Sequence, residues 1–469
     1  MYVVYTLAIP LIASAICALF GRKTKIAAYA AVTGMTLSAV LFTANLFVAT
    51  SATAGLDSFA TTAGLSTVGL MVAYVVIVIG TFVTWFSLPY IGNAGRIYYP
   101  LLLIIISTTA GAVLSTNVAT LYIFLEIGTL STAILVTYRK GRAFEAATKF
   151  IVLNSIGSSF TLIALILMFL NYGTLNIGSF GTASSNAVLL MSLFLFIGLG
   201  TKIGVVPMHS WVPDAYGEAP TPVSTFLAGT VKAATAFILI RFLFALHPAA
   251  DVVLLFIAVT AVLTVGVGAL MAYTQKDLKR FLAYSSIEQA GIILFAVGIG
   301  SSAALTGGIF QIINNMVMKS LVFLCVGAII AATRQRNVDG LGGLVTKMPI
   351  VAGGFLIGAL ALSGIPPLNG FISEYLILQA GFEKGGLYPA LSVALLVLTF
   401  PMFAGYIRVF QRVFLTVDQK IKAPTVSYLS IYIIIPIIIL SVLCVLMGVF
   451  PTAIVDQINK VSLAVLGGQ

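Results

Sequence analysis

The chain has 469 residues, of which 60% are hydrophobic and only 8% are charged, and its formal charge is +11. An average soluble domain has about 25% charged residues, so this composition excludes a water-soluble globular protein. Because one membrane crossing takes about 20 apolar residues, the chain can hold a dozen or more transmembrane helices, and no extramembrane catalytic domain fits beside them. Its three cysteines are far apart in apolar runs, so they offer neither a metal cluster nor an obvious disulfide framework.

Fourteen apolar segments are long enough to cross a membrane, and they predict an all-α polytopic membrane protein. In chain order, segments 1 to 14 span residues 3–20, 27–49, 67–91, 98–114, 117–137, 148–170, 187–215, 221–244, 252–273, 281–299, 305–331, 350–379, 388–414 and 428–449. Basic residues follow segment 1 and none precedes it, which indicates an uncleaved helix with an external N-terminus. An even number of crossings then places both termini outside.

Basic residues alternate between the connections, as the positive-inside rule requires. One side of the membrane carries Arg241, Lys384 and Lys460. The other, which we assign to the cytoplasm, carries 18 of the 24 basic residues: Arg22, Lys23, Lys25, Arg96, Arg139, Lys140, Arg142, Lys149, Lys276, Lys279, Arg280, Arg334, Arg336, Lys347, Arg408, Arg412, Lys420 and Lys422. Topology therefore accounts for the net charge, and no nucleic-acid partner is expected.

Six ionisable residues fall inside the predicted crossings, and their charges sum to zero. If they faced lipid, they would cost about 15 to 21 kcal/mol at about 2.5 to 3.5 kcal/mol each, so they must meet each other or water. We therefore expect a hydrated polar axis through the bundle. The six residues are Glu126, Lys202, Lys232, Glu288, Lys319 and Glu374.

A carboxylate and several lysines near the bilayer centre can form a charge relay. Glu126 lies about nine residues into its segment, or roughly 14 Å deep, and Lys202, Lys232 and Lys319 are also near mid-depth. The proton affinity of a lysine depends strongly on neighbouring charges, so a proton can move when that balance changes. The alternative is a static ion pair between Glu126 and Lys202 that locks two helices together.

The other polar residues in the membrane allow two interpretations each. Glu288 and Lys319 are relay candidates, but either could instead reach a helix end or a loop. Glu374 could exchange protons towards the outer face or be a helix-end carboxylate. His209 could carry protons between two lysines. With only two histidines in the chain, we expect no zinc site.

Segments 7 and 12 are longer than one crossing needs, and proline breaks both of them. Segment 7 contains KIGVVP and segment 12 contains GIPPLNG. Non-helical backbone at membrane depth must be buried in protein or line a water-filled cavity. The breaks lie five segments apart, and this odd spacing indicates that segments 4–8 recur inverted in segments 9–13. The predicted regions are residues 1–97 (three helices), 98–246 (first repeat), 247–414 (inverted repeat) and 415–469 (last helix and tail).

Specific motifs accompany these charges. They are Glu126 itself, KIGVVPMHSWVPDAYGEAPT from Lys202, GTVK ending at Lys232, DLKRFLAYSSI before Glu288, KSLVFL from Lys319, and GIPPLNGF before Glu374. Together they resemble the antiporter-like, proton-conducting subunits of respiratory complex I, of membrane-bound energy-converting hydrogenases and of multisubunit Na+/H+ antiporters. The resemblance covers segments 4 to 13.

The resemblance implies roles for individual residues. Glu126 and Lys202 would form a coupled pair, Lys232 would link two half-channels, and Glu374 would end the route. Segment 11 lacks the histidines often found in this family and has Gln311 nearby, which implies a greater dependence on water there. The sequence YSSIEQAG around Glu288 resembles hydrogenase-type and formate-hydrogenlyase-type subunits.

The implied function is proton translocation within a larger energy-converting complex of a prokaryotic-type plasma membrane. Iron-sulfur, nickel or flavin cofactors are then expected only in partner subunits, with no cofactor in this chain. A Na+/H+ antiporter without redox partners is the first alternative. A purely structural scaffold with static charge pairs and a single-chain solute symporter are the others.

Overall fold

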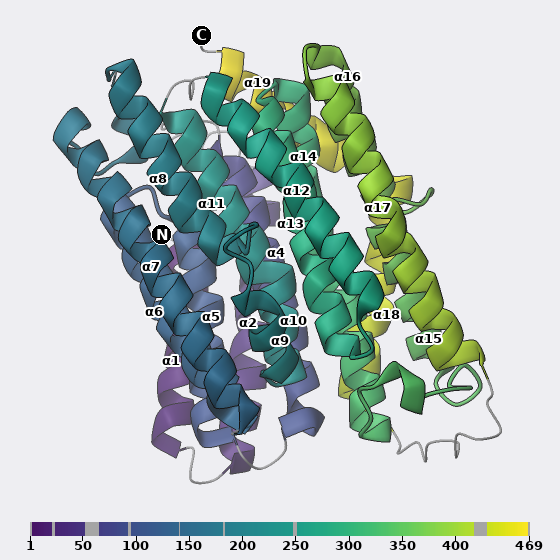
Figure 1. Ribbon diagram of the computed structural model, residues 1–469. Coiled ribbons are helices and arrows are strands. Elements are labelled where there is room, and N and C mark those ends of the chain that lie inside the picture. The colour runs from purple at the N-terminus through teal and green to yellow at the C-terminus, as the bar shows by residue number, and fades with distance from the viewer. Residues whose placement is uncertain are drawn as a thin grey trace.

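The computed structural model describes residues 2–20, 24–51, 65–91, 95–139, 141–181, 183–246, 251–416 and 429–467. Arg22, Lys23, Lys140, Lys420 and Lys422 of the predicted cytoplasmic set lie outside these ranges. The described residues form long helices that run side by side as a bundle (Figure 1), with two isolated β-bridges and no longer strand among them. The predicted all-α class is thus confirmed for this part of the chain.

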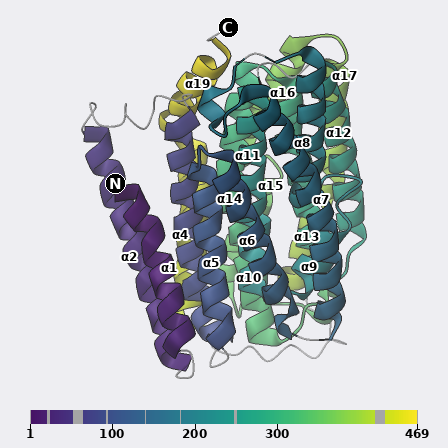
Figure 2. The same ribbon diagram turned by 90° about the vertical axis from the view of Figure 1, so that its left-hand side faces the viewer.

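The first half of the bundle contains one broken crossing and, in the crossing after it, a π-helical turn. Its helices are α1 (Tyr2–Phe20), α2 (Thr24–Ser51), α4 (Leu65–Ile91), α5 (Gly95–Leu114), α6 (Val118–Val136), α7 (Arg142–Tyr172), α8 (Ser185–Ile203), α9 (Trp211–Glu218), α10 (Thr221–Phe226), the π-helical turn η3 (Leu227–Val231) and α11 (Lys232–Ala245). Helices α1 and α2 flank the bundle against α4 and α5 (Figure 2).

The second half contains one broken crossing and ends in a short helix. Its helices are α12 (Asp251–Thr274), α13 (Leu278–Ile299), α14 (Ser302–Thr333), α15 (Pro349–Leu362), α16 (Asn369–Lys384), α17 (Tyr388–Phe410) with the π-helical turn η5 (Gln411–Leu415), α18 (Ile431–Val449) and α19 (Thr452–Gly467).

Helices occur at all fourteen predicted segments. Twelve of the described helices are long and apolar enough to cross a membrane. The other two predicted crossings correspond to the shorter apolar helix Thr6–Phe20 and to the pair α15 and α16. Helix α19 was expected only as tail. It packs on α14 and α4 with one apolar face, so its sequence lacks the continuous apolar run that predicts a membrane span.

Both predicted proline breaks are present. Helix α8 ends at Ile203, where Gly204 takes a φ of +81°, and helix α15 ends just before Gly364, whose φ is +63°. Glycine adopts this left-handed backbone without the steric cost that other residues carry. Each break also contains a cis proline, at Pro207 and at Pro367.

Two more local features occur once in each half. Asn117 caps α6 and forms a β-bridge with Asn176, whereas Asp277 caps α13 and forms a β-bridge with Asn337. Asn176 and Asn337 in turn cap the 3-10 turns Ile177–Ser179 (η2) and Val338–Gly340 (η4), respectively. These pairs support the division into repeats at 98–246 and 247–414, which we keep as a proposal.

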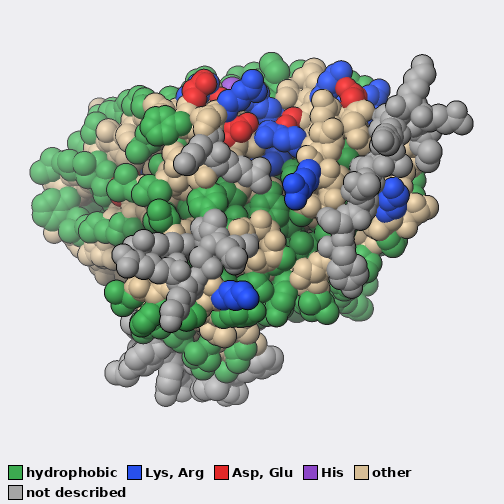
Figure 3. All heavy atoms as spheres, turned by 90° about the horizontal axis from the view of Figure 1, so that it is seen from below, with side chains coloured by type: hydrophobic (Ala, Val, Ile, Leu, Met, Phe, Trp, Pro, Cys, Tyr) green, Lys and Arg blue, Asp and Glu red, His purple; other side chains and the backbone are tan. Residues whose placement is uncertain are grey.

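Where the structure describes them, the predicted cytoplasmic connections meet on one face of the bundle. Figure 3 shows Lys, Arg, Asp and Glu side chains gathered there. Asp339 in the connection after α14 binds Lys276 and Arg412 at 2.8 Å each. The hydrogen bond from Lys276 holds the pKa of Asp339 below its usual range, with Arg412 adding to the effect.

Glycine allows α12 and α13 to approach closely. A Cβ atom added to Gly268 would lie 2.5 Å from the backbone nitrogen of Glu288 and 2.8 Å from its Cα. We therefore expect Gly268→Ala to push the helices apart and to destabilise the protein by about 1 to 3 kcal/mol, the usual range for overpacking. Thermal unfolding of the detergent-purified protein measures this effect. Gly353→Ala is the control, since a Cβ there meets nothing within 4 Å, and equal losses for both variants would contradict the explanation.

Candidate functional site

Glu126 and Lys202 form an ion pair between α6 and α8, with Nζ 3.2 Å from Oε1. Ser158 of α7 donates to the same carboxylate oxygen at 2.5 Å, and Lys202 also donates to Thr129 at 2.9 Å. The Lys202 side chain is only 6% exposed, whereas that of Glu126 is 29% exposed. The pair therefore has an inner cationic end and a carboxylate that reaches the surface of the chain.

Lys232 is placed by the π-helical turn that precedes it. The turn η3 ends at Val231, and Lys232 begins α11 with its backbone N–H bonded to the carbonyl of Leu227. Its buried Nζ donates to the carbonyl of Ser286 in α13 at 2.7 Å. Lys232 thus connects a helix of the first half with one of the second half.

A cavity of about 50 Å³ lies between Lys202 and Lys232. One water molecule needs about 10 to 15 Å³ and several polar partners, so the cavity has room for a few waters. Its polar lining includes the two lysines with Thr108, Thr109, Thr129, Thr132, Thr235 and Asn154. A hydrated connection between the two amines is therefore sterically possible.

His209 lies in the break between α8 and α9, within electrostatic range of Lys232. It is not among the residues that line the cavity. Within the described part of the chain, its buried Nδ1 has no hydrogen-bond partner. The structure thus brings His209 close to one of the two lysines that it was expected to connect.

Lys319 is held by two hydroxyl groups that sequence reasoning did not select. Its Nζ donates to Ser285 of α13 and, at 3.3 Å, to Tyr406 of α17. The two hydroxyl oxygens are themselves 2.5 Å apart. Ser285 lies in the DLKRFLAYSSI motif, but nothing in the sequence around Tyr406 pointed to this contact.

Glu288 is buried on α13, within electrostatic range of both Lys232 and Lys319. Its Oε2 accepts a hydrogen bond of 3.1 Å from the side-chain amide of Gln289. Gln289 in turn accepts from Gln311 at 2.7 Å. Burial and these contacts place Glu288 inside the bundle, where the alternative of a loop contact does not apply.

Glu374 lies on α16, directly beside the second proline break. A Cβ atom added to Gly364 would lie 3.2 Å from its Cδ. The Gln289 amide and the Glu288 charge both interact with its carboxyl group. Glu288 and Glu374 are therefore neighbours around one glutamine side chain.

The helices that carry the six intramembrane charges follow one another across the bundle. The series begins on α6 and α8, passes α11, α13 and α14, and ends on α16 at the opposite side of the bundle (Figure 1). The series therefore runs across the bundle, roughly perpendicular to the helix axes and parallel to the expected plane of the membrane. Such a series can move charge laterally between the two halves.

Thr129 offers a test of the pair at the start of the series. We expect Thr129→Val to lower proton translocation about tenfold, because Lys202 loses one of its two acceptors and the cavity loses a hydroxyl. Proton uptake by membrane vesicles that contain the variant measures this effect. Thr84→Val makes the same change at a buried hydroxyl that bonds to Gly80 of its own helix, and should leave the rate unchanged. Equal rates of proton uptake in Thr129→Val and Thr84→Val would show that Thr129 has no role in the site.

Comparison with known proteins identifies the family. Residues 115–400, more than half of the chain, match the family described as NADH:quinone oxidoreductase/Mrp antiporter, TM. The chain belongs to this family. Membership confirms the resemblance to antiporter-like subunits, and with the apolar helices it establishes a multi-pass membrane protein.

Individual relatives are consistent with membership of this family. The hydrogenase-4 component F homolog of Methylacidiphilum infernorum is 33% identical over 294 residues, which are 60% of this chain and 62% of that protein, so the match spans less than two thirds of it. NADH-quinone oxidoreductase subunit N of Desulforudis audaxviator is 28% identical over 386 residues, 78% of this chain and 76% of that protein.

The solved structures include a chain with a similar fold. A chain of the Mrp complex from a Dietzia species superposes with a TM-score of 0.88 at 20% identity, covering 100% of this chain and 97% of that chain. At this identity the likeness shows the fold alone. It supports the helical, polytopic fold of the present chain.

Proposed function

We propose that the chain is a proton-translocating, antiporter-like subunit of an energy-converting redox complex, similar to complex I or membrane-bound hydrogenase, in a prokaryotic plasma membrane. The observation that carries this proposal is the series of charges across the bundle, of which Lys202, Lys232, Glu288 and Lys319 are buried. The proton route comprises Glu126, Lys202, Lys232, Lys319 and Glu374. Glu288 is an additional relay group within the series, and His209 is a candidate side group next to Lys232.

Proton movement in this proposal starts with the Glu126–Lys202 pair. The Glu126 side chain is 29% exposed on the outside of the chain, so a charge change in a neighbouring membrane subunit can act on it directly. When this pair weakens, the Lys202 amine transfers its proton to water in the adjoining cavity, which Lys232 also lines. The resulting charge change at Lys232 acts on Lys319 and Glu288, and through Glu288 on Glu374.

Electron transfer belongs to partner subunits in this proposal. Among the described residues, no group of three or more His, Cys, Asp and Glu side chains could hold a metal ion. Iron-sulfur clusters, nickel or flavin would be bound by peripheral subunits, while this chain contributes the proton route. Its direct partners would be other membrane subunits of the complex and the lipid bilayer.

The alternative is a subunit of a multisubunit Na+/H+ antiporter without redox partners. The description of the family to which the chain belongs names the Mrp antiporter beside NADH:quinone oxidoreductase, and this favours the alternative. The same series of lysines and carboxylates would then exchange H+ against Na+.

The test is to extract the tagged chain from its native membrane in mild detergent. Copurified proteins are identified, and bound iron, nickel and flavin are measured. The proposal expects iron-sulfur proteins with nickel or flavin, whose electron transfer drives proton uptake in vesicles. Recovery of membrane partners alone, with no metal or flavin, would reject the redox complex and leave the Na+/H+ antiporter.

A further inference from the structure

The short helix α9 contacts the backbone beside both relay lysines of the first half. Trp211 Nε1 donates to the carbonyl of Thr201, the residue before Lys202, at 2.9 Å. Tyr216 donates to the carbonyl of Leu227 at 3.3 Å, and that carbonyl also accepts the backbone N–H of Lys232. Both aromatic side chains are buried, and they line the cavity between the lysines.

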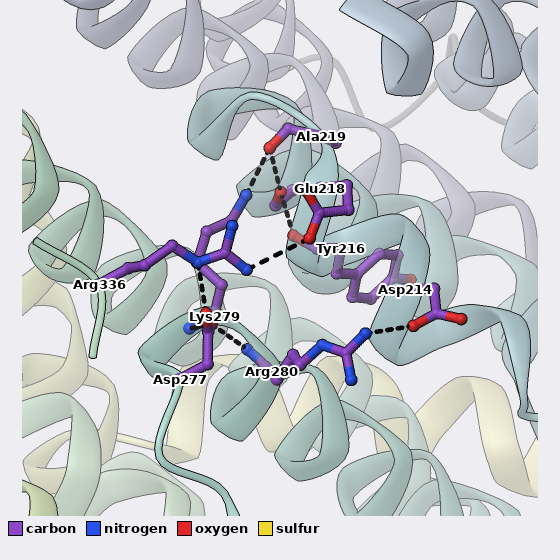
Figure 4. Close-up of polar contacts among 9 residues, drawn as sticks. Asp214, Tyr216, Glu218, Ala219, Asp277, Lys279, Arg280 and Arg336 are labelled. Atoms are coloured by element: carbon purple, nitrogen blue, oxygen red, sulfur yellow. Dashed lines mark hydrogen bonds and ion pairs between the residues drawn. The ribbon is translucent and has the colours of Figure 1, made fainter. Parts of the chain in front are cut away.

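Charged side chains of the second half hold the other side of α9 (Figure 4). Arg280 binds Asp214 at 2.5 Å, and Arg336 binds Glu218 at 3.5 Å. Both arginines also lie against Gly217, where an added Cβ would be 3.4 Å from Arg280 Cγ and 3.7 Å from Arg336 Nη2. Asp214 also binds Lys149 of α7 at 3.0 Å, so the acidic face of α9 is held from both halves of the bundle.

Lys279 holds the C-terminal end of α9. The sequence places it among cytoplasmic connections, but the structure buries its side chain completely. Its Nζ donates to the carbonyl of Ala219, the C-terminal cap residue of α9. An ammonium group is stabilising at this end of a helix, where the unpaired carbonyls give a partial negative charge.

One residue fixes all three cations relative to each other. Asp277, the N-cap of α13, accepts the backbone N–H groups of Lys279 and Arg280 at 2.9 and 3.1 Å. It also forms an ion pair with Arg336 (Figure 4). The cations therefore form one frame at the start of α13, the helix that carries Ser286 and Glu288 farther along.

We propose that α9 is a positioning element through which Lys279, Arg280 and Arg336 set the places of Lys202 and Lys232. An isolated helix of eight residues is marginally stable, and non-helical residues flank α9, so its place depends on contacts at its two sides. A shift at the start of α13 is thereby transmitted to both lysines. This inference deepens the proposed function and rests on it, since it assigns the coupling between the two halves of the route.

Amide hydrogen exchange in the purified complex tests the proposal independently of transport. In Arg280→Gln, α9 loses a clamp, so exchange in residues 201–205 and 227–232 should rise about tenfold. Arg280→Lys should restore most of the protection. The control is Arg412→Gln, which breaks an ion pair with Asp339 on the same face without touching α9, and it should leave both segments at the wild-type rate.

Tyr216→Phe gives a second test that removes only one hydroxyl group. Exchange should rise in residues 227–232 and stay unchanged in 201–205, because Trp211 still holds the Thr201 carbonyl. Unchanged exchange in both segments for Arg280→Gln and Tyr216→Phe would overturn the proposal. If exchange rises as expected but Lys202→Met translocates protons normally, the positioning role of α9 stands and the proposed proton route through Lys202 is rejected.

Discussion

Proton translocation should fall to background when Lys202 is replaced by methionine, while the driving reaction of the partner subunits stays measurable. Methionine has a similar length but cannot accept or donate a proton, so the route loses the amine between Glu126 and the cavity. Loss of a positioned proton carrier costs about a hundredfold or more in rate. Dye-quenching measurements on inverted vesicles, with the driving reaction followed in parallel, give both quantities.

Removal of Lys202 alone leaves the Glu126 carboxylate without its cation, which can destabilise the protein. The double variant Glu126→Gln with Lys202→Met removes both charges and should fold, yet still fail to translocate protons. The control is Lys276→Met, which breaks an exposed ion pair with Asp339 outside the route. Normal translocation in Lys202→Met would mean that the Glu126–Lys202 pair is a static lock, as in the scaffold alternative.

Length and composition were sufficient to predict most of the fold. Long apolar runs form helices in a membrane because all backbone hydrogen bonds are then made within the segment. The same argument located both breaks, since proline cannot continue a helix and glycine permits the turn at Gly204 and Gly364. It did not reveal α19, whose single apolar face matters only once α14 and α4 are in place.

The charged members of the site could be predicted because charge is rare in a membrane, but their polar partners could not. Ser158, Thr129 and Tyr406 are ordinary helix residues in sequence, and only tertiary packing brings them to Glu126, Lys202 or Lys319. The burial of Lys279 could not be predicted for a related reason. The sequence places Lys279 in a connection, just before the predicted segment 281–299, whereas packing against α9 buries its side chain.

Glu288→Gln should also reduce proton translocation about a hundredfold or more. Beyond Lys319, the side chains that approach Glu374 include Gln289, Gln311 and Ser373, which bond to one another. Amides and hydroxyls form hydrogen bonds but do not hold an extra proton at neutral pH, so the carboxylate of Glu288 is needed there. Glutamine keeps the size of the side chain. The rate of proton uptake relative to the driving reaction measures the effect.

The matched control is Glu383→Gln, the same change at the far end of α16, where the carboxylate bonds to Gln379 at an exposed position. It should translocate at the wild-type rate, and an equal rate in Glu288→Gln would show that Glu288 is structural.

A rescue of the Glu288→Gln variant is a second test. Because Gln311 donates to Gln289 at 2.7 Å, a Gln311→His change places a group that titrates near neutral pH in the amide chain. It should restore part of the translocation lost in Glu288→Gln, since the route would regain a group able to take up and release a proton.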